Sequence, residues 1–175
     1  MPRSDALIRT ASLDDLPLIQ QLGRTTYVDH FAGLWSAAGL EQFLAQDFAS
    51  AALESSLGDP GRHQWLLAFA EEGEAIGLSK TNWGRANPLT GVTGAELQKI
   101  YLRRAAVGQG IGERLLSSVL GSAREKEQAN VWLDVLKSNS GAQQFYARHG
   151  FRKIGEIAFA SDLQEIGMLV MLRQL

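Results

Sequence analysis

The chain has 175 residues, of which 45% are hydrophobic and 21% are charged, as in soluble globular domains and unlike disordered, collagen-like or membrane-spanning chains. Its 17 Lys and Arg residues against 19 Asp and Glu residues give a net charge of −2, which argues against nucleic-acid binding. No cysteine is present, which excludes disulfides, thiol nucleophiles and cysteine-bound zinc, and the three histidines match no metal-site spacing. No stretch predicts a signal peptide or a membrane span. We therefore expect one cytoplasmic domain over residues 1–175, with no metal and no membrane or nucleic-acid partner.

The first third of the chain is predicted to be mostly helical. A short strand at residues 7–10 precedes Ser12, which can form a capping box with Asp15 at the start of a helix. Gly23 is expected to interrupt this helix. Residues 25–59 are expected to form one or two further helices, with one apolar face made of Leu40, Phe43, Leu44 and Phe48.

The rest of the chain alternates between strand and helix patterns. Apolar runs and alternation predict strands at residues 64–70, 75–81, 96–102, 131–136, 153–159 and 166–172, with a loop at 82–94. One helix is expected after a glycine-rich turn at 108–112. A second is expected after Ser140, which with Gln143 can form a capping box, and it should end at Gly150 with Phe151 packed back onto it. This order predicts a mixed α/β layered fold.

The glycine-rich turn is the clearest candidate for a ligand site. Its alternating glycines let backbone N–H groups approach a ligand closely, and the helix that follows adds unpaired N–H donors and a partial positive charge. Such an arrangement suits a phosphate or pyrophosphate. A dinucleotide fingerprint fails because Glu113 stands where the third glycine belongs, and no Gly-Lys-Ser/Thr follows as in a P-loop. A turn without any ligand is the alternative.

Two segments resemble a known family. ELQKIYLRRAAVGQGIGERLL, at residues 96–116, resembles motif A of the GNAT acyltransferase superfamily, and VWLDVLKSNSGAQQFYARHGF, at residues 131–151, resembles motif B. The resemblance implies a mostly antiparallel central sheet with two splayed parallel strands and flanking helices. Dimers are common in this superfamily, so a homodimer is one expectation. One departure is Val107, which stands where the family often has Arg or Gln and removes one side-chain contact to phosphate.

The resemblance also implies where acetyl-CoA binds. Main-chain groups of Ile100 and Leu102 would pair with the pantetheine amides, and Asn139 would contact the same arm beside the small Ala142. Arg103 and Arg104 would either approach the adenosine phosphates or lie as solvated surface residues. The pyrophosphate would be held by the glycine loop, which comprises Val107, Gly108, Gln109, Gly110, Ile111 and Gly112.

Two side chains are candidates for chemistry. Tyr146 would be the general acid, since a phenol near the sulfur can donate a hydrogen bond or a proton to the departing thiolate. Glu96 would be the general base, accepting a proton from the amine through water. The alternatives are a core aromatic for Tyr146 and a solvent-facing or ion-paired residue for Glu96. A non-catalytic acyl-CoA sensor on the same fold would need neither residue.

The acceptor is expected to be a primary amine of a small molecule or a peptide. The stretch between Thr25 and Phe48, with TTYVDHFAGLW and LEQFLAQDF, is similar to the helical acceptor side of the polyamine (spermidine/spermine) N-acetyltransferase branch. Four residues from this segment are candidates for an acceptor site, with core packing as the alternative: Tyr27, His30, Phe31 and Trp35. Acidic side chains at Asp29, Glu41 and Asp47 would complement a polyamine.

Overall fold

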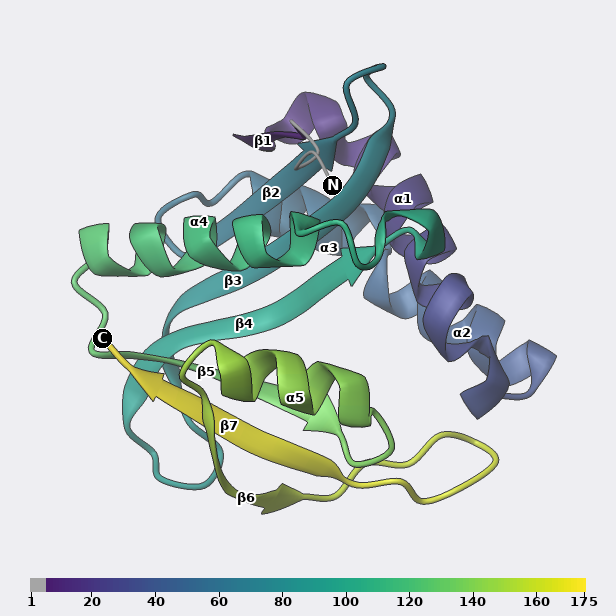
Figure 1. The fold of residues 1–175 in the computed structure, drawn as a ribbon. Helices are drawn as coiled ribbons and strands as arrows, with labels where there is room; N and C mark the ends of the chain where they lie inside the picture. Colours follow the sequence, from purple (N-terminus) through teal and green to yellow (C-terminus); the bar gives the residue numbers. More distant parts are fainter. Residues whose placement is uncertain (1–5) are drawn as a thin grey trace.

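The computed structural model describes residues 6–175 as a sheet with helices on both faces (Figure 1). Its strands are β1 (Leu7–Thr10), β2 (His63–Phe69), β3 (Ala75–Ala86), β4 (Thr93–Leu102), β5 (Asn130–Leu136), β6 (Arg152–Ile157) and β7 (Met168–Gln174). Its α-helices are α1 (Leu16–Phe31), α2 (Ala37–Asp47), α3 (Ser50–Leu57), α4 (Ile111–Glu125) and α5 (Ser140–Arg148). Single 3-10 turns occur at Leu13–Asp15, Ala32–Leu34 and Arg104–Ala106.

The seven described strands lie in the order β1-β2-β3-β4-β5-β7-β6. Every neighbouring pair is antiparallel except β4 and β5. These two parallel strands pair only at Ala95 with Val131 and at Glu96 with Trp132, and then diverge toward their carboxyl ends (Figure 1). The predicted sheet, mostly antiparallel with one splayed parallel pair, is confirmed.

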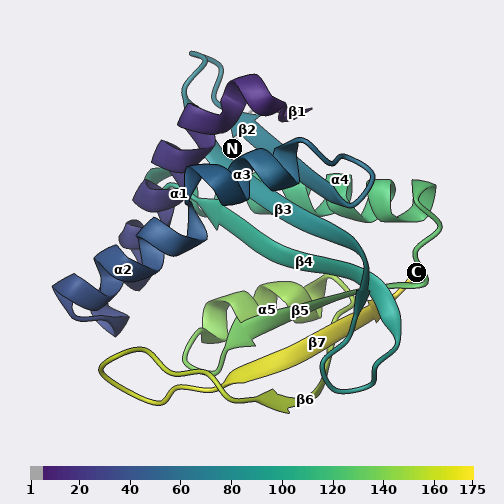
Figure 2. The same ribbon diagram turned by 180° about the vertical axis from the view of Figure 1, so that it is seen from behind.

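Each face of the sheet has its own hydrophobic core. Helices α4 and α5 cover one face and enclose a cluster that includes Leu97, Leu115 and Leu133. Helices α1 and α3 cover part of the other face over a second cluster, which includes Leu67 and Leu78. Figure 2 shows that on this second face no helix of residues 6–175 covers β5 or β7. Side chains of these strands therefore reach solvent there without crossing a helix.

Helix α1 runs through Gly23, so the expected interruption is wrong. The capping box of Ser12 and Asp15 is present as predicted, although it opens a 3-10 turn that leads into α1. A Cβ atom at position 23 would lie 2.2 Å from the ring of Phe48. The glycine therefore allows the helix to pack closely against Phe48. Its cost is the low helix propensity of glycine, which weakens the helix without interrupting it.

The loop expected at residues 82–94 is mostly strand. Strand β3 continues to Ala86, because the register shifts between Asn82 and Arg85 and Gly84 adopts φ +61° there. This irregularity lets the strand bend where the sequence suggests a break. Strands β6 and β7 are also displaced by one or two residues from their expected ends.

The N-cap of helix α5 lies one residue earlier than predicted. The N-cap is Asn139, whose side-chain oxygen accepts a hydrogen bond from the N–H of Ala142 at 3.1 Å, so the capping box at Ser140 is wrong. At the other end, Gly150 has φ +85° and the N–H of Phe151 donates to the Tyr146 carbonyl at 3.0 Å. Phe151 packs back on Tyr146, with ring centroids 5.6 Å apart, as predicted.

Candidate functional site

The backbone of β4 is free on one side beyond its short pairing with β5. The N–H of Arg103 donates to the Ile76 carbonyl at 2.8 Å, and hydrogen-bonded positions alternate along an antiparallel ladder. Leu102 lies opposite Gly77, so Leu102 and, two residues earlier, Ile100 occupy positions not hydrogen-bonded to β3. Their main-chain groups therefore point toward the side where β5 has diverged. An extended molecule can pair with this edge as an added strand does.

One group on this edge already has a partner. The ring Nε2 of His30, on α1, donates to the Leu102 carbonyl at 2.8 Å. His30 was predicted to line the acceptor site, but the structure places its ring against the end of β4. The hydrogen bond occupies one lone pair of the carbonyl oxygen and leaves the Leu102 N–H free.

The glycine loop has the backbone geometry that an anion site needs. Gly108 and Gly110 have φ values of +82° and +81°, and a Cβ at either position would meet no atom within 4 Å. Gly110 is the N-cap of α4, and no side chain caps the helix. The first N–H groups of α4 therefore lack intrahelical acceptors. Such a helix start, preceded by glycines without side chains, is suited to binding an anion.

The other loop residues act mainly on the fold. Ile111, the first residue of α4, is buried in the core, and the side-chain amide of Gln109 donates to the Ala105 carbonyl at 2.8 Å. Val107 is exposed. Gly112 lies beside Leu102, which a Cβ would approach to 3.6 Å. This distance is an ordinary van der Waals contact, so packing alone does not require a glycine at position 112.

Arg103 and Arg104 are both engaged by Asp29 of α1. The Nε of Arg103 and the backbone N–H of Arg104 each donate to Asp29 Oδ2 at 3.2 Å, and the Arg104 guanidinium also donates to the Asp29 carbonyl. The N–H of Arg104 and the guanidinium of Arg103 lower the pKa of the Asp29 carboxyl. These contacts tie α1 to the segment between β4 and α4. Both arginines therefore have a structural role in this structure.

Asn139 and Tyr146 approach the splayed strands from α5. The side-chain oxygen of Asn139 caps the helix, and its Nδ2 group has no partner within residues 6–175. Tyr146 is buried between Phe145 and Phe151, with ring centroids 5.4 and 5.6 Å away. Burial raises the pKa of the Tyr146 phenol well above its usual value, so the hydroxyl stays protonated at neutral pH. It forms no hydrogen bond with any residue in 6–175 and can donate to a ligand.

Polar side chains from three strands lie on the face opposite α4 and α5. We call this set the polar face, and it consists of Lys80, Asn82, Glu96, Lys99 and Asp134. Glu96 is its centre: its Oε1 accepts a hydrogen bond from Asn82 Nδ2 at 2.8 Å and lies 3.8 Å from Arg85 Nε. Since Glu96 is also part of the last β4–β5 pair, its carboxylate lies where the two strands separate.

Asp134 is a candidate that the sequence analysis missed. Its neighbours Leu133 and Val135 belong to the core under α4 and α5, so its own side chain points to the polar face. The carboxylate is exposed and has no hydrogen bond or ion pair within residues 6–175. Partial desolvation and the charge of Glu96 raise the pKa of Asp134 to about 6. A single charged residue within the apolar run VWLDVL was the available signal.

The predicted acceptor residues Tyr27, Phe31 and Trp35 come together in one aromatic cluster. Trp35 Nε1 donates to the Tyr27 hydroxyl at 3.0 Å, and the Tyr27 and Phe31 centroids are 4.9 Å apart. Phe43 of α2 and Tyr101 of β4 complete the cluster, each within 6.1 Å of one of these rings. Burial raises the pKa of Tyr27 and Tyr101. The cluster is part of the second core and borders the carboxyl end of β4.

The segment between β6 and β7 docks onto the same cluster. Phe159 lies edge-on to Trp35, with centroids 6.4 Å apart. Asp162 accepts hydrogen bonds from the Ser36 N–H, at 3.0 Å, and from the Ser36 hydroxyl, and these lower the pKa of Asp162. The start of α2 and the β6–β7 segment are thus joined beyond the carboxyl ends of the splayed strands (Figure 1).

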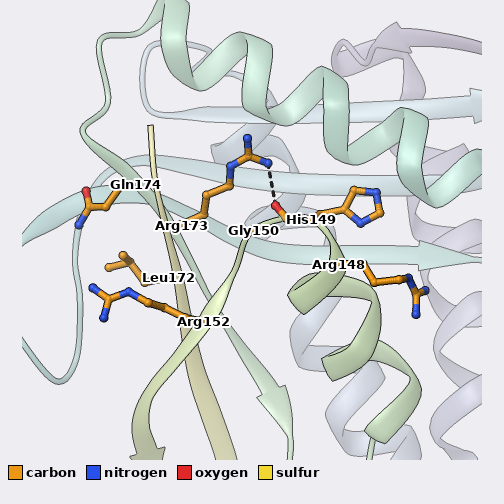
Figure 3. Close-up of a pocket in the computed structure, with 7 residues that line it drawn as sticks. All are labelled: Arg148, His149, Gly150, Arg152, Leu172, Arg173 and Gln174. Carbon is orange, nitrogen blue, oxygen red and sulfur yellow. Dashed lines mark hydrogen bonds between the residues drawn. The ribbon is translucent and has the colours of Figure 1, made fainter.

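A separate basic hollow lies at the other end of β5 (Figure 3). It is lined by Arg148, His149, Gly150, Arg152, Leu172, Arg173 and Gln174. Arg173 Nη1 donates to the His149 carbonyl at 2.7 Å, which satisfies part of its guanidinium. Leu172, Arg173 and Gln174 belong to β7 and pair with the first residues of β5, so this hollow lies on the β7 side of β5 and not on the β4 side.

Residues 6–175 contain no group of three or more His, Cys, Asp or Glu side chains arranged to hold a metal ion. Within the same residues, no helix combines the length and apolar character that crossing a membrane requires.

Comparisons with known proteins agree with this geometry. The chain is 29% identical over 146 residues to an uncharacterized N-acetyltransferase of Lactobacillus delbrueckii subsp. lactis, with 83% of each chain covered. It is 30% identical over 134 residues to an acetyltransferase of Agrobacterium fabrum, covering 73% of this chain and 96% of the relative.

Solved structures share the fold. PaiA N-acetyltransferase from Thermoplasma acidophilum, solved in complex with coenzyme A, superposes with a TM-score of 0.79 at 21% identity, covering 98% of this chain and 99% of its own. Ribosomal-protein-alanine N-acetyltransferase from Brucella melitensis gives a TM-score of 0.72 at 24% identity, with 97% and 99% covered. The family model described as "Acetyltransferase (GNAT) family" matches residues 25–151, well over half of the 175 residues. The chain therefore belongs to the GNAT acetyltransferase family.

Proposed function

We propose that this N-acetyltransferase holds acetyl-CoA along the free edge of β4 and the glycine loop, and transfers the acetyl group to a primary amine of a small molecule or peptide. The observation that carries the proposal is the short β4–β5 pairing next to a loop in which Gly108 and Gly110 adopt positive φ and leave open space where a side chain would stand. When bound, the coenzyme supplies an acetyl thioester, from which the acetyl group passes to the amine while coenzyme A leaves as a thiol.

The binding residues act mainly through their main chain. Ile100 and Leu102 offer N–H and C=O groups to the amides of the pantetheine arm. The N–H groups of the glycine loop and of the first turn of α4 bind the pyrophosphate, assisted by the helix dipole. The free Nδ2 of Asn139 adds a side-chain donor on the α5 side. Backbone recognition makes the exposed Val107 compatible with this role.

Proton removal from the amine falls to Glu96 and Asp134. An ammonium group must lose a proton before its nitrogen can form the new C–N bond. Glu96 is engaged by Asn82, whereas Asp134 is unpartnered and its pKa of about 6 is close to what a base needs near neutral pH. We propose that Asp134 accepts the first proton of the ammonium group. Its pKa is raised by partial desolvation and by the charge of Glu96.

Tyr146 acts on the leaving group. Its phenol, whose pKa burial raises, donates a hydrogen bond to the sulfur as the C–S bond breaks. Of the two protons that an ammonium loses on becoming an amide, one ends on the thiol and the other passes to solvent.

The acidic residues that were expected to complement a polyamine do not support a polyamine acceptor. Asp29 binds Arg103, Glu41 lies 2.5 Å from Arg24 Nη2, and Asp47 is paired with Lys99. Since each carboxylate is neutralised by the chain itself, the charge argument for a polyamine loses its support, and the acceptor class must be argued from other residues.

The experiment is a thiol-release assay with acetyl-CoA and a panel of polyamines, amino acids, amino sugars and peptides. Acceptor-dependent thiol release, with the acetylated product seen by mass spectrometry, is the expected result. Calorimetric binding of acetyl-CoA without turnover on any acceptor would favour a sensor, and absence of binding would contradict the proposal.

A further inference from the structure

Two lysines face each other across β3 and β4 on the polar face, and only one has a carboxylate partner. Lys80 lies directly opposite Lys99 in the strand register. Lys99 is buried, and its ammonium lies 2.5 Å from Asp47 Oδ2. Lys80 is half-buried and forms no ion pair or hydrogen bond within residues 6–175; its ammonium lies over the Trp65 ring, 5.5 Å from the centroid. Because like charges directly opposite destabilise a sheet, one counter-charge is missing here.

The surroundings of Lys80 disfavour its positive charge. Burial, followed by repulsion from Lys99, lowers the pKa of Lys80 to about 8. Asp47 and Glu96 oppose this effect and Arg85 adds to it. The ammonium is still mostly protonated at pH 7, so the folded chain keeps a partly desolvated cation without a partner. Such a group is typical of a binding site, where an anionic ligand supplies the partner.

Two carboxylates, those of Glu96 and Asp134, lie on the polar face on the side toward β5. Glu96 lies opposite Asn82, two residues along β3 from Lys80, which places the Cα atoms of Lys80 and Glu96 about 8 Å apart from strand spacing alone. Asp134 lies beyond Glu96 on β5 and is also unpartnered. The face therefore presents a free cation at one end and a free carboxylate at the other, over the span of a small molecule.

We propose that the acceptor is an amino acid, or another small amine bearing a carboxylate, and that Lys80 binds this carboxylate while the amine lies beside Glu96 and Asp134. The inference rests on the proposed acetyl transfer and names its acceptor class. A charge-assisted hydrogen bond from Lys80 gives the missing counter-charge and orients the amine toward the splayed strands. A polyamine would instead bring a second ammonium against Lys80.

The test compares acceptors in matched pairs: leucine with leucinamide, and phenylalanine with phenylalaninamide, with spermidine alongside. The wild-type enzyme is expected to show a kcat/KM at least tenfold higher for the acid of each pair. The amine of an amide is less basic than that of the acid, so its intrinsic reactivity runs against this preference, which must then come from binding. Equal or better use of the amides or of spermidine would overturn the inference.

Substitutions of Lys80 test whether this residue causes the preference for acids. Lys80→Gln is expected to reduce the preference for acids at least tenfold, mainly through a higher KM for the acid of each pair. Lys80→Arg should retain part of the preference. Lys126→Gln, at the exposed C-terminal end of α4, is the matched control and should change neither value. An unchanged preference in Lys80→Gln would show that another group reads the carboxylate.

A binding measurement separates this inference from the proposed function. Calorimetric titration of coenzyme A-loaded protein with N-acetylleucine should give binding that N-acetylleucinamide and the Lys80→Gln variant lack. Binding of N-acetylleucine without any acetyl transfer would retain the carboxylate site and remove the catalytic proposal. Transfer to amines with no difference between the two N-acetyl compounds would do the reverse.

Discussion

The two faces of the sheet present different chemical groups to a ligand. On the side of α4 and α5, the free edge of β4 and the glycine loop offer main-chain N–H and C=O groups over an apolar core. On the other side, the groups are charged side chains from β3, β4 and β5, namely the polar face. The first face suits a ligand shared by many proteins, because any sequence has a backbone. The second can change its ligand by changing a few residues, which agrees with the proposal that the acceptor binds there.

The largest effect is expected at Tyr146, the side chain on the α4 and α5 side that we propose acts on the leaving group. Tyr146→Phe removes only the hydroxyl, which has no hydrogen bond within residues 6–175, so the fold should be intact. Loss of the hydrogen bond to the departing sulfur should lower kcat by about a thousandfold. Steady-state kinetics measure the loss, and the Kd for acetyl-CoA is the control. Wild-type turnover would show that this side contributes binding alone.

A second substitution tests whether buried charge on the other side is structural. Asp47→Asn leaves the buried Lys99 without its partner and should lower the free energy of unfolding by about 3 kcal/mol, as measured by urea denaturation. Glu41→Gln is the matched control: its ion pair with Arg24 is largely exposed, so it should cost less than about 0.5 kcal/mol. Equal losses of unfolding free energy in the two variants would show that the burial of Lys99 adds nothing to the importance of its ion pair.

Asp134→Asn should separate activity from stability. Without the base, kcat/KM should fall about a hundredfold. The pKa of Asp134 is raised to about 6 in the folded protein, so its ionisation opposes folding above that pH. Because the carboxylate is exposed, the variant should gain no more than about 1 kcal/mol at pH 7. The gain should fade as pH falls from 6 to 4. A destabilised variant would point to a structural role instead.

The main-chain site is tested by a pair of glycines in the same region. Gly110→Ala puts a side chain at φ +81°, where strain of about 1–2 kcal/mol should distort the loop and weaken acetyl-CoA binding roughly tenfold. Gly121→Ala, in the middle of α4 with no atom within 4 Å of the new Cβ, should leave the affinity unchanged and stabilise the helix by about 1 kcal/mol. Calorimetry with acetyl-CoA measures both, and equal affinities would contradict backbone recognition.

The same division explains what the sequence could predict. Glycines at 108 and 110 and the strand before them report backbone requirements that are local in the chain, so the glycine loop could be located from spacing. The polar face depends on strand register. Lys80 lies opposite Lys99, and Asp134 lies near Glu96, only once β3, β4 and β5 are aligned. The predicted helix break at Gly23 was wrong for a related reason. The glycine packs against Phe48, which lies 25 residues further along the chain, so the contact could not be read from the local sequence.

The smallest effect concerns the coupling of two carboxylates across the splayed strands. In Glu96→Gln the negative charge that helps raise the pKa of Asp134 is gone, although partial desolvation, the larger cause, remains. The pKa of Asp134 should therefore fall from about 6 toward, but not to, its usual range. The acidic limb of kcat/KM against pH should move to lower pH by less than about one unit, with the plateau reduced only severalfold. Profiles between pH 5 and 8 with a saturating coenzyme measure the shift, and Asp134→Asn should lack this limb altogether. Loss of the plateau in Glu96→Gln, to the level of Asp134→Asn, would instead make Glu96 the proton acceptor and leave Asp134 as its neighbour, because a group that only tunes another cannot be needed at every pH.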